Sequence, residues 1–293
     1  MMDDSGVELA HREQAVTGES PLWDDTRNTL WWIDIQGRRL LGHHVENGHL
    51  APAPMPAEIG LVALAEDGNL VVGLEDGLYL FSPETGRLSR LTPVPSAHPN
   101  IRLNDGKPDP QGRLWFGSMD KSGSGVPLGA LYCRHPGGRL EIVRTGVSIP
   151  NAIAISPDGA TLYFTDSPSQ TVLAFDLDRQ TGVLSNERVF LTFAGTDKPD
   201  GACVDSRGGF WIAVVHGARI DHFTAAGAFV ESFTLPVAKP TMCVFGGPEL
   251  SNLYITSQRR FLSDEQLAAQ PLTGSLLRLR TSGKGQPTQR VRL

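Results

Sequence analysis

A repeated pattern along the chain is the feature that most limits how it can fold. Six stretches share a short turn followed by an aromatic or apolar strand, and they recur at intervals of roughly 40 to 48 residues. Repeats of this length are typical of propeller blades, because one copy cannot bury its apolar face alone and must stack on its neighbours. The first apolar residues of the six copies are Leu30, Leu70, Leu114, Leu162, Phe210 and Leu253.

A second hairpin pattern follows in every copy, as a strand, a turn and another strand. Two hairpins make a four-stranded blade, so the sequence predicts an all-β fold, a six-bladed β-propeller that occupies residues 1–293 as one domain. A β-sandwich or two unrelated β domains would not explain why both hairpins recur in the same order. The second hairpins are HHVENGHL, LYLFSPETGRLSRL, LYCRHPGGRLEIV, VLAFDLDRQTGVL, IDHFTAAGAFV and LLRLRTSGKGQ.

Closing such a ring requires one end of the chain to supply the outermost strand of a blade. The segment GVELAHRE, residues 6–13, is the candidate for this strand. The three cysteines and five tryptophans are embedded in the strand patterns, so we expect them in the apolar core.

The charge pattern bears on the partners of the chain. The formal net charge is −6 and the 26 lysines and arginines are scattered, unlike the basic surface of a nucleic-acid-binding protein. No apolar run reaches the roughly 18 residues that cross a bilayer, and the N-terminus MMDDSGVELAHREQ is acidic where a signal peptide would be basic. We therefore expect a small-molecule partner, no nucleic acid, no membrane and a cytoplasmic location.

Polar residues recur where the innermost strands of the predicted blades begin. These strands start about 9 to 12 residues before the first apolar residue of each copy and would line a central channel. Equivalent positions in different copies therefore face one another. They hold Glu19, Glu58, Asn104 with Asp105, Asn151, Asp200 and Thr241.

Three of these positions suggest a metal site. Glu19, Asn151 and Asp200 lie in register, so their oxygen atoms would converge in the channel. Two carboxylates brought close together repel unless a cation lies between them. Oxygen ligands favour Ca²⁺, Mg²⁺ or Mn²⁺, and Zn²⁺ or Fe²⁺ is less natural without histidine. The alternative is that these polar groups cap backbone groups or bind channel water.

Several longer segments of the chain resemble the SMP-30/gluconolactonase family. They are GESPLWDD, RLNDGKPDPQGRLWFGSM, AFDLDRQTGVLSNERVF, KPDGACVDSRGGFWIAV, CVFGGPELSNLYIT and QPLTGSLLRL, which occur in the family's order over nearly the whole chain. The resemblance implies a six-bladed propeller with one divalent metal, whose ligands here would be Glu19, Asn151 and Asp200.

The same resemblance implies roles for further residues. Arg102 and Asn104 would bind the hydroxyls of the substrate, and Asp200 would double as general base. Asp105 would support the metal site or, alternatively, act only as a turn residue before a glycine. The chain departs from the family pattern in GSMDKSGSGVPLGA, where Asp120 and Lys121 stand in a region that contacts the sugar in some members. This departure leaves the identity of the sugar open.

The function expected from these residues is metal-dependent hydrolysis of a sugar lactone to the aldonic acid. The sequence has no G-x-S-x-G, H-E-x-x-H or phosphate-loop motif that would indicate another catalytic scheme. His216 is a candidate substrate contact, whereas His43 and His44 are expected on an outer hairpin. Two alternatives remain: a metal-dependent organophosphate hydrolase and a non-catalytic calcium-binding propeller.

Overall fold

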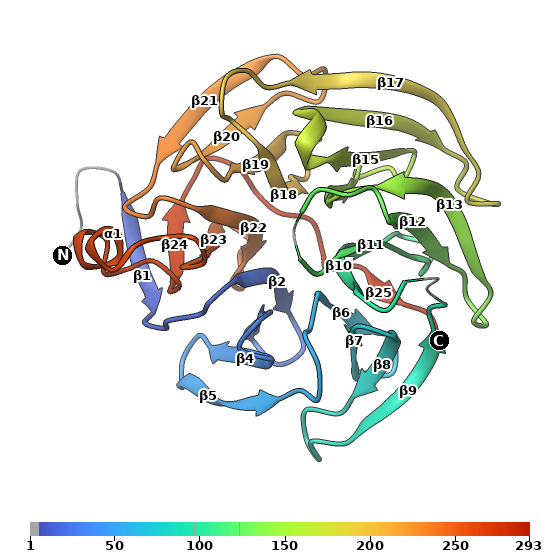
Figure 1. Cartoon of the computed structure of the whole chain (residues 1–293), viewed down its shortest axis with the longest axis horizontal. Coiled ribbons are helices and arrows are strands. Elements are labelled where there is room, and N and C mark those ends of the chain that lie inside the picture. Colours follow the sequence, from blue (N-terminus) through green and yellow to red (C-terminus); the bar gives the residue numbers. More distant parts are fainter. Residues whose placement is uncertain (1–5, 96–97, 123) are drawn as a thin grey trace.

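The computed structural model describes residues 6–95, 98–122 and 124–293. Six sheets stand around a central axis, each with one edge toward that axis, so the predicted six-bladed β-propeller is confirmed (Figure 1). Blade 1 contains β2 (Gly18–Asp24), β3 (Thr29–Asp34), β4 (Arg39–His44) and β5 (Gly48–Pro54). Blade 2 contains β6 (Leu61–Ala65), β7 (Leu70–Gly73), β8 (Gly77–Phe81) and β9 (Leu88–Pro93).

The other four blades follow in chain order. Blade 3 contains β10 (Ile101–Pro108), β11 (Leu114–Asp120), β12 (Gly129–Arg134) and β13 (Leu140–Val147). Blade 4 contains β14 (Pro150–Ile155), β15 (Thr161–Asp166), β16 (Thr171–Leu177) and β17 (Leu184–Thr192). Blade 5 contains β18 (Pro199–Val204), β19 (Phe210–Val214), β20 (Arg219–Phe223) and β21 (Phe229–Thr234). Blade 6 contains β22 (Pro240–Gly246), β23 (Asn252–Ser257), β24 (Leu276–Arg280) and β1 (Val7–His11).

The apolar core lies between neighbouring blades. Trp211 of β19 packs edge-on against Phe245 of β22 with ring centroids 5.4 Å apart, and Tyr163 of β15 lies 4.9 Å from Phe210 of β19. All five tryptophans are buried, as predicted. Burial falls from the channel outward, because the outermost strands pack on one face only: β2 is buried throughout, whereas β21 is mostly exposed.

An acidic turn residue fixes the buried tryptophan in three blades. Asp205 accepts hydrogen bonds from two backbone N–H groups of its own turn and from Trp211 Nε1 at 3.1 Å. The turn and the core are thereby held together by one side chain. The equivalent pairs in blades 1 and 3 are Asp24 with Trp31 and Asp109 with Trp115.

The N-terminal segment closes the ring. β1 pairs antiparallel with β24, so the predicted role of residues 6–13 is confirmed. The hairpin predicted within LLRLRTSGKGQ is wrong, because only its first part is a blade strand, β24. Since β1 already occupies the outer edge of β24, the chain leaves blade 6 after Arg280.

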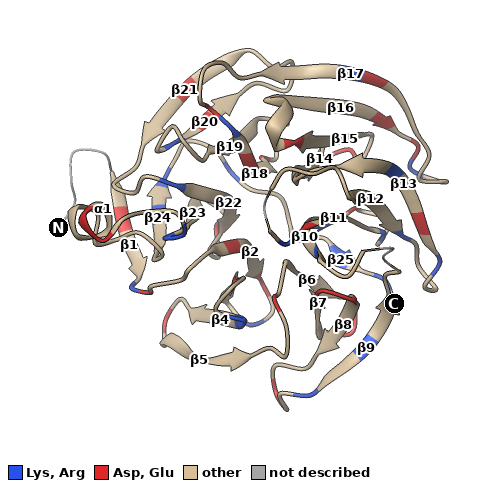
Figure 2. Cartoon of the chain, in the orientation of Figure 1, with Lys and Arg blue, Asp and Glu red and all other residues tan. Residues whose placement is uncertain are grey.

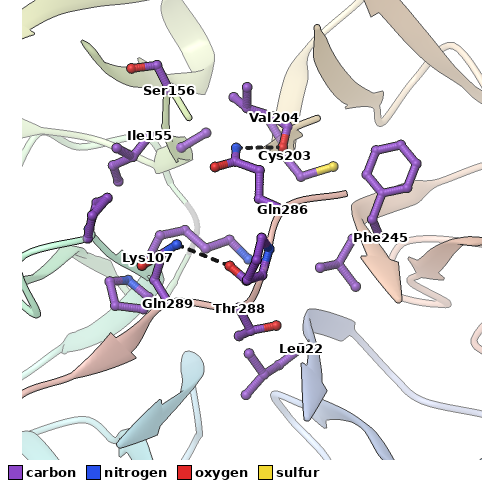
Figure 3. A pocket seen from close by; sticks show the side chains of 16 residues that line it. Leu22, Lys107, Ile155, Ser156, Cys203, Val204, Phe245, Gln286, Thr288 and Gln289 are labelled. Carbon is purple, nitrogen blue, oxygen red and sulfur yellow. Dashed lines mark hydrogen bonds between the residues drawn. The ribbon is translucent and has the colours of Figure 1, made fainter. Parts of the chain in front are cut away.

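The end of the chain instead crosses one face of the propeller. This C-terminal segment, residues 281–293, accepts a bond from Ser206 N at Lys284 O and donates from Gly285 N to Leu250 O, at 2.8 and 2.7 Å. Gln286 Nε2 donates to Val204 O at 3.0 Å (Figure 3). Its last strand, β25 (Arg290–Val291), pairs parallel with β6 of blade 2.

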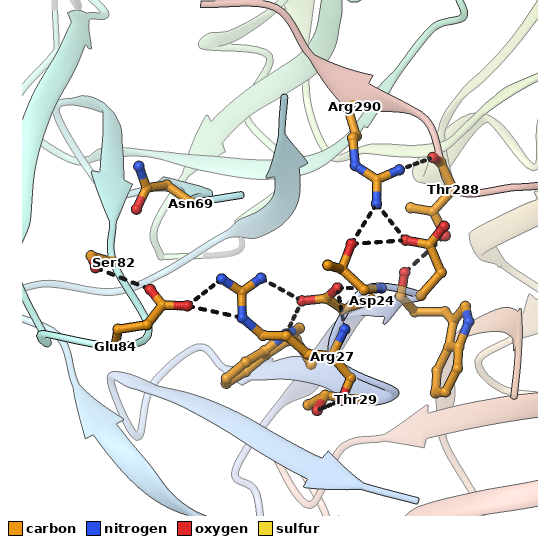
Figure 4. A network of polar contacts seen from close by, with 12 residues as sticks. Asp24, Arg27, Thr29, Asn69, Ser82, Glu84, Thr288 and Arg290 are labelled. Atoms are coloured by element: carbon orange, nitrogen blue, oxygen red, sulfur yellow. Dashed lines mark hydrogen bonds and ion pairs between the residues drawn. The ribbon is translucent and has the colours of Figure 1, made fainter. Parts of the chain in front are cut away.

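Blade 1 is joined to this segment by side chains. Thr288 Oγ1 donates to Trp23 O at 2.8 Å, and Arg290 pairs with Asp25 (Figure 4). In the same turn Arg27 bridges Asp24 and Glu84, linking blade 1 to blade 2 (Figure 4). The C-terminal segment therefore connects blades that are far apart in the sequence.

The strand order gives the channel two different ends. All innermost strands run in the same direction, so they begin at one end, here the entry face, and end at the other, here the turn face. The C-terminal segment covers the turn face. A short helix, α1 (Asp264–Ala269), lies in the connection between β23 and β24 and begins with a capping box at Ser263. Within the described residues, no helix has the length and apolar character needed to cross a membrane.

Candidate functional site

A cavity of about 210 Å³ opens at the entry face of the channel. Its walls come from the starts of the innermost strands of five blades, those that contain β2, β10, β14, β18 and β22. The five predicted site residues all line it: Glu19, Arg102, Asn104, Asn151 and Asp200. Residues spread over about 180 positions of the sequence are thus brought together, as the alignment of repeats predicts. Figure 2 marks the acidic positions along the innermost strands, of which Glu19 on β2 and Asp200 on β18 line this cavity.

A β-bulge follows the channel-facing residue in each of these five strands. Ser20 and Ala152, directly after Glu19 and Asn151, adopt the left-handed backbone conformation with φ of 48° and 51°. A bulge interrupts the regular alternation of side chains along a strand and so changes the direction in which one of them points. The pairing shifts register between Glu19 and Leu22, Asn104 and Gly106, Asn151 and Ala154, Pro199 and Ala202, and Pro240 and Met242.

A chain of hydrogen bonds orients the amides of the cavity. Arg102 Nη1 donates to Asn104 Oδ1 at 2.7 Å, and Asn104 Nδ2 donates to Asn151 Oδ1 at 2.8 Å. Asn151 Nδ2 donates to Ser167 Oγ at 2.9 Å, and Ser167 Oγ donates to Pro199 O at 2.7 Å. The Oδ1 atom of Asn151 therefore keeps one lone pair for a further ligand.

Ser167 is a site residue that the sequence analysis missed. It directly follows β15 and lines the cavity beside Asn151. The repeat pattern contains a signal for it, because the residue after the second strand of a blade lies opposite the start of the first strand. Val215 and Gln258 occupy the same place in blades 5 and 6 and also line the cavity.

Two carboxylates share the cavity without a cation paired to either. Burial and the charge of Asp105 raise the pKa of Glu19 to about 8, while Lys107 and Arg102 lower it less strongly. Burial and the charge of Glu19 raise the pKa of Asp200 well above its usual range. In the described part of the chain, neither Glu19 nor Asp200 forms an ion pair. The guanidinium of Arg102, which also lines the cavity, pairs instead with Glu58 at 3.5 Å. Such a pair of repelling acids attracts a positive charge.

Asp105 follows Asn104 in β10 and supports the neighbouring blade. Its Oδ2 accepts a bond from Ile153 N at 2.9 Å, and its Oδ1 is buried without a hydrogen-bond partner. Burial raises the pKa of Asp105 to about 6. The residue therefore does more than stabilise its own turn, because it ties β10 to the bulge that orients Asn151.

The donor set fits a divalent cation. Glu19, Asn151 and Asp200 present oxygen atoms only, which suits a hard cation and leaves coordination positions for water or substrate. Among the described residues no group of three or more His, Cys, Asp or Glu could hold a metal ion. A site here consequently depends on the amide of Asn151 in addition to the two carboxylates.

Two channel positions do not present a ligand. Thr241 donates through Oγ1 to Gly18 O at 2.5 Å and also contacts Thr256 Oγ1, so it joins blade 6 to blade 1. In blade 2, Glu58 is turned to Arg102 and does not line the cavity. Burial lowers the pKa of Arg102 to about 10, which leaves its guanidinium charged at neutral pH.

In the region that departs from the family pattern, Asp120 and Lys121 bind residues outside the cavity. Asp120 accepts hydrogen bonds from the hydroxyls of Ser122 and Ser124, and Lys121 pairs with Glu75 at 2.7 Å. Neither Asp120 nor Lys121 lines the cavity, whereas Met119 does. The wall formed by blade 3 at this point is therefore apolar.

Basic side chains surround the mouth of the cavity, and the sequence analysis missed most of them. Lys198, Lys239 and Arg260 line it together with His216, the one histidine expected near the channel. Burial and the charges of Lys239 and Lys198 lower the pKa of His216. His43 and His44 lie on β4, away from the cavity, as expected.

Comparison with known proteins identifies the family of the chain. Residues 17–259 match the family model described as the SMP-30/gluconolactonase/LRE-like region. The chain is 34% identical over 278 residues to a 6-deoxy-6-sulfogluconolactonase of Pseudomonas putida, with 94% of each chain covered. It is 32% identical to regucalcin of Gallus gallus, with 96% of each chain covered.

A solved structure shows the same likeness in three dimensions. It is that of a calcium-binding protein, regucalcin, from Agrobacterium tumefaciens, with a TM-score of 0.92 and 30% identity over 97% of this chain and 98% of the other. The family match spans the strands that carry all five cavity residues predicted from the sequence. The chain therefore belongs to the SMP-30/gluconolactonase family.

Proposed function

We propose that this protein hydrolyses a sugar lactone to the aldonic acid, with a divalent metal ion held by Glu19, Asn151 and Asp200. The observation that carries the proposal is the pair of carboxylates that share the cavity without a paired cation, next to an oriented amide oxygen. The names of its relatives support the substrate class, since one is a sulfogluconolactonase and another a putative sugar lactone lactonase of Bacillus subtilis.

The metal ion and the protein would divide the chemical work. A bound divalent cation would polarise the lactone carbonyl and make the attacking water easier to deprotonate. Asp200 would take the proton from that water as general base, a contribution of roughly 10² to 10⁴ in rate. The walls of the cavity would exclude other water, which strengthens each of these electrostatic interactions.

Arg102 and Asn104 would hold the ring of the lactone. Both amide hydrogens of Asn104 are already donated, to Pro150 O and Asn151 Oδ1, so its oxygen is the atom that can accept a substrate hydroxyl. Arg102 donates from Nη1 to Asn104 Oδ1 and Leu103 O, and its buried Nε faces Glu58 Oε2 at 3.5 Å. The guanidinium would therefore donate to the sugar through Nη2, which fixes the orientation of the ring.

In this proposal the whole chain acts as one domain. The proposed ligands come from blades 1, 4 and 5, and the hydroxyl-binding residues come from blade 3. The proposed site is thus assembled from four blades of one ring.

A calcium-binding propeller without catalysis is the second candidate. It is favoured by the likeness to the regucalcin structure described as a calcium-binding protein. An organophosphate hydrolase would use the same cation and carboxylates on a phosphorus centre. Both alternatives keep the proposed metal ligands and differ in what the cavity acts on.

A lactone panel separates the three functions. The protein is treated with a chelator and then supplied with Zn²⁺, Mn²⁺, Mg²⁺, Ca²⁺ or Fe²⁺, and acid release is measured with gluconolactone and arabinonolactone. We expect turnover to be lost on chelation and restored by at least one cation. Tight cation binding without turnover of any lactone would favour the calcium-binding propeller, and turnover of phosphotriesters alone would favour the organophosphate hydrolase.

A further inference from the structure

A second ring of side chains stands above the proposed metal ligands. Each of its members lies two residues before Glu19, Asn104, Asn151, Asp200 or Thr241, and its backbone partner lies at the end of the second strand of the same blade. All of them line the cavity. In chain order the ring consists of Thr17, Arg102, Ile149, Lys198 and Lys239.

The charges of this ring are unevenly distributed. Arg102 and Glu58, from neighbouring blades, offset each other at 3.5 Å. Lys198 and Lys239 occupy equivalent Lys-Pro positions of blades 5 and 6, and within the described ranges neither has an acidic partner. Asp197, next to Lys198, is engaged by Arg219 at 2.6 Å. Two positive charges at the mouth of the cavity therefore remain without a counter-ion.

A third cation reaches the mouth from the connection that contains α1. Arg260 lines the cavity, and its guanidinium lies 4.5 Å from the ring centre of Phe261. Lys239 Nζ lies 5.4 Å from the same ring and donates to the carbonyl oxygens of Arg260 and Phe261 at 3.3 Å. Burial lowers the pKa of Lys239, and no carboxylate counteracts this shift.

The metal ion of the proposed function would not use these charges. Glu19 and Asp200 together carry the two negative charges that balance a divalent cation. The further negative charge of Asp105 is offset by Lys107, which lowers the pKa of Asp105. The mouth cations are then left without a balancing charge, and like charges held close together without an anion are unfavourable. An anionic group on the ligand would remove this repulsion and form charge-assisted hydrogen bonds.

We propose that the lactone bound by this protein carries an anionic substituent away from its carbonyl, and that Lys198, Lys239 and Arg260 bind that substituent. The inference rests on the proposed function, because it takes the lactone carbonyl to lie at the carboxylate end of the same cavity. The substituent is an oxyanion, a carboxylate, a sulfonate or a phosphate, since lysine and arginine bind each of these through N–H donors.

A purely structural role is the competing explanation for Lys239. Its two bonds to backbone carbonyls would hold the turn at residues 260–261 whether or not a ligand is bound. Lys198 has no such bonds, so it separates the two explanations. A role in anion binding predicts that loss of either lysine changes the preference between substrates, whereas a role in holding the turn predicts equal losses for all substrates.

The first test compares lactones that share one ring and differ in the group at C6. Gluconolactone is compared with its 6-phosphate, its 6-deoxy-6-sulfo form and its 6-carboxylate, a glucaric acid lactone, using the metal-loaded protein. We expect kcat/KM to be at least about tenfold higher for one of the anionic lactones, mainly through a lower KM, and to fall as ionic strength rises. Equal kcat/KM for neutral and anionic lactones would overturn the inference while leaving the proposed function intact.

The second test removes the charges. We expect Lys198→Gln, and the double variant with Lys239→Gln, to reduce the ratio of anionic to neutral kcat/KM by about tenfold for each lysine. Lys284→Gln is the control, because this lysine is exposed on the C-terminal segment at the opposite face. A ratio that stays constant in the double variant would overturn the inference.

A binding measurement does not depend on turnover. Titration calorimetry compares 6-phosphogluconate with gluconate, which differ by the phosphate alone. We expect the phosphorylated acid to bind at least about tenfold more tightly, and the double lysine variant to lose that difference. If the protein hydrolyses no lactone but retains this difference, the proposed function fails and the anion subsite stands. Equal affinity for the two acids overturns the subsite.

Discussion

The two ends of the channel are built from the same strands and have opposite characters. At the entry face, the innermost strands begin with polar residues aimed by β-bulges into an open cavity with unbalanced charges. At the turn face, the same strands end beside apolar residues such as Leu22 and Phe245, in a smaller cavity of about 120 Å³ bounded by the C-terminal segment (Figure 3).

The difference shows how one strand serves both function and stability. β10 contributes Arg102 and Asn104 to the entry face, and its last residues, Lys107 and Pro108, line the cavity of the turn face. Backbone groups at the turn face are bonded to the C-terminal segment, whereas the carboxylates at the entry face lack a paired cation. Carboxylates without a paired cation lower the local stability of the fold, and a local loss of this kind is characteristic of functional sites.

The largest effect is expected from a change at the entry face. Asp200→Asn removes the proposed base and one proposed ligand, so we expect kcat/KM for lactones to fall by roughly 10²- to 10⁴-fold. The chelated variant should unfold at a higher temperature than the chelated wild type, because one of two repelling carboxylates is gone. Steady-state kinetics and thermal unfolding measure both effects. Glu249→Gln, an exposed carboxylate, is the control; unchanged lactonase activity in Asp200→Asn would refute the assignment.

The next largest effect is expected at the turn face. Removal of residues 283–293 deletes bonds to blades 1, 2, 3, 5 and 6 and uncovers the apolar floor of the channel. We expect the free energy of unfolding to fall by about 3 kcal/mol or more. The midpoint of urea unfolding measures this loss. Lys284→Gln changes a side chain of the same segment that takes no part in these bonds, so it should leave the midpoint unchanged. A truncated protein as stable as the full chain would contradict the role given to the segment.

Chelation should make the stability of the entry face depend on pH. The folded-state pKa values of Asp105 and Glu19, about 6 and about 8, lie above the ordinary values. The folded protein then binds these protons more tightly than the unfolded chain, and the stability they contribute is complete below about pH 4. We expect the unfolding temperature of the chelated protein to fall as pH rises through 6 and 8.

Divalent cations should reverse that loss. Because they compete with protons for Glu19 and Asp200, the stabilisation they produce should be greater at pH 8 than at pH 6. Thermal unfolding at pH 6 and at pH 8, with and without chelator, measures this stabilisation. Glu19→Gln should remove the upper part of the dependence, and a chelated protein whose stability rises between pH 6 and 8 would disprove the interpretation.

The smallest effect is expected at a residue that only orients a proposed ligand. Ser167→Ala removes the acceptor of Asn151 Nδ2, so we expect cation affinity to fall by about tenfold. Ser167→Thr keeps the hydroxyl and should restore much of the affinity. The control is Ser169→Ala, in the same turn but exposed. Calorimetric titration of the cation measures the change, and identical affinities of Ser167→Ala and the wild type would remove Ser167 from the site.

Much of this arrangement could be predicted from the sequence because it follows from repetition. The recurrence of the pattern in six copies predicts six blades, and equivalent position within a blade predicts that Glu19, Asn151 and Asp200 line one cavity. The N-terminal strand was predictable because a ring must close. Lys198 and Lys239 could have been found in the same way, since both precede a proline at the start of an innermost strand.

The remaining features depend on contacts between segments without a shared pattern. The path of the C-terminal segment is set by bonds to five blades, and no periodicity in residues 281–293 indicates it. The direction of Asp120 and Lys121 away from the cavity depends on Ser122, Ser124 and Glu75.

By itself the sequence determined the number of blades and the set of polar positions that face the channel, because a repeat imposes the same local structure on each copy. Only the tertiary structure decided which of those residues lie close enough to influence one another's pKa, how the amides are oriented and which end of the channel is closed. These properties depend on distances between blades, and such distances are established only when the ring is complete.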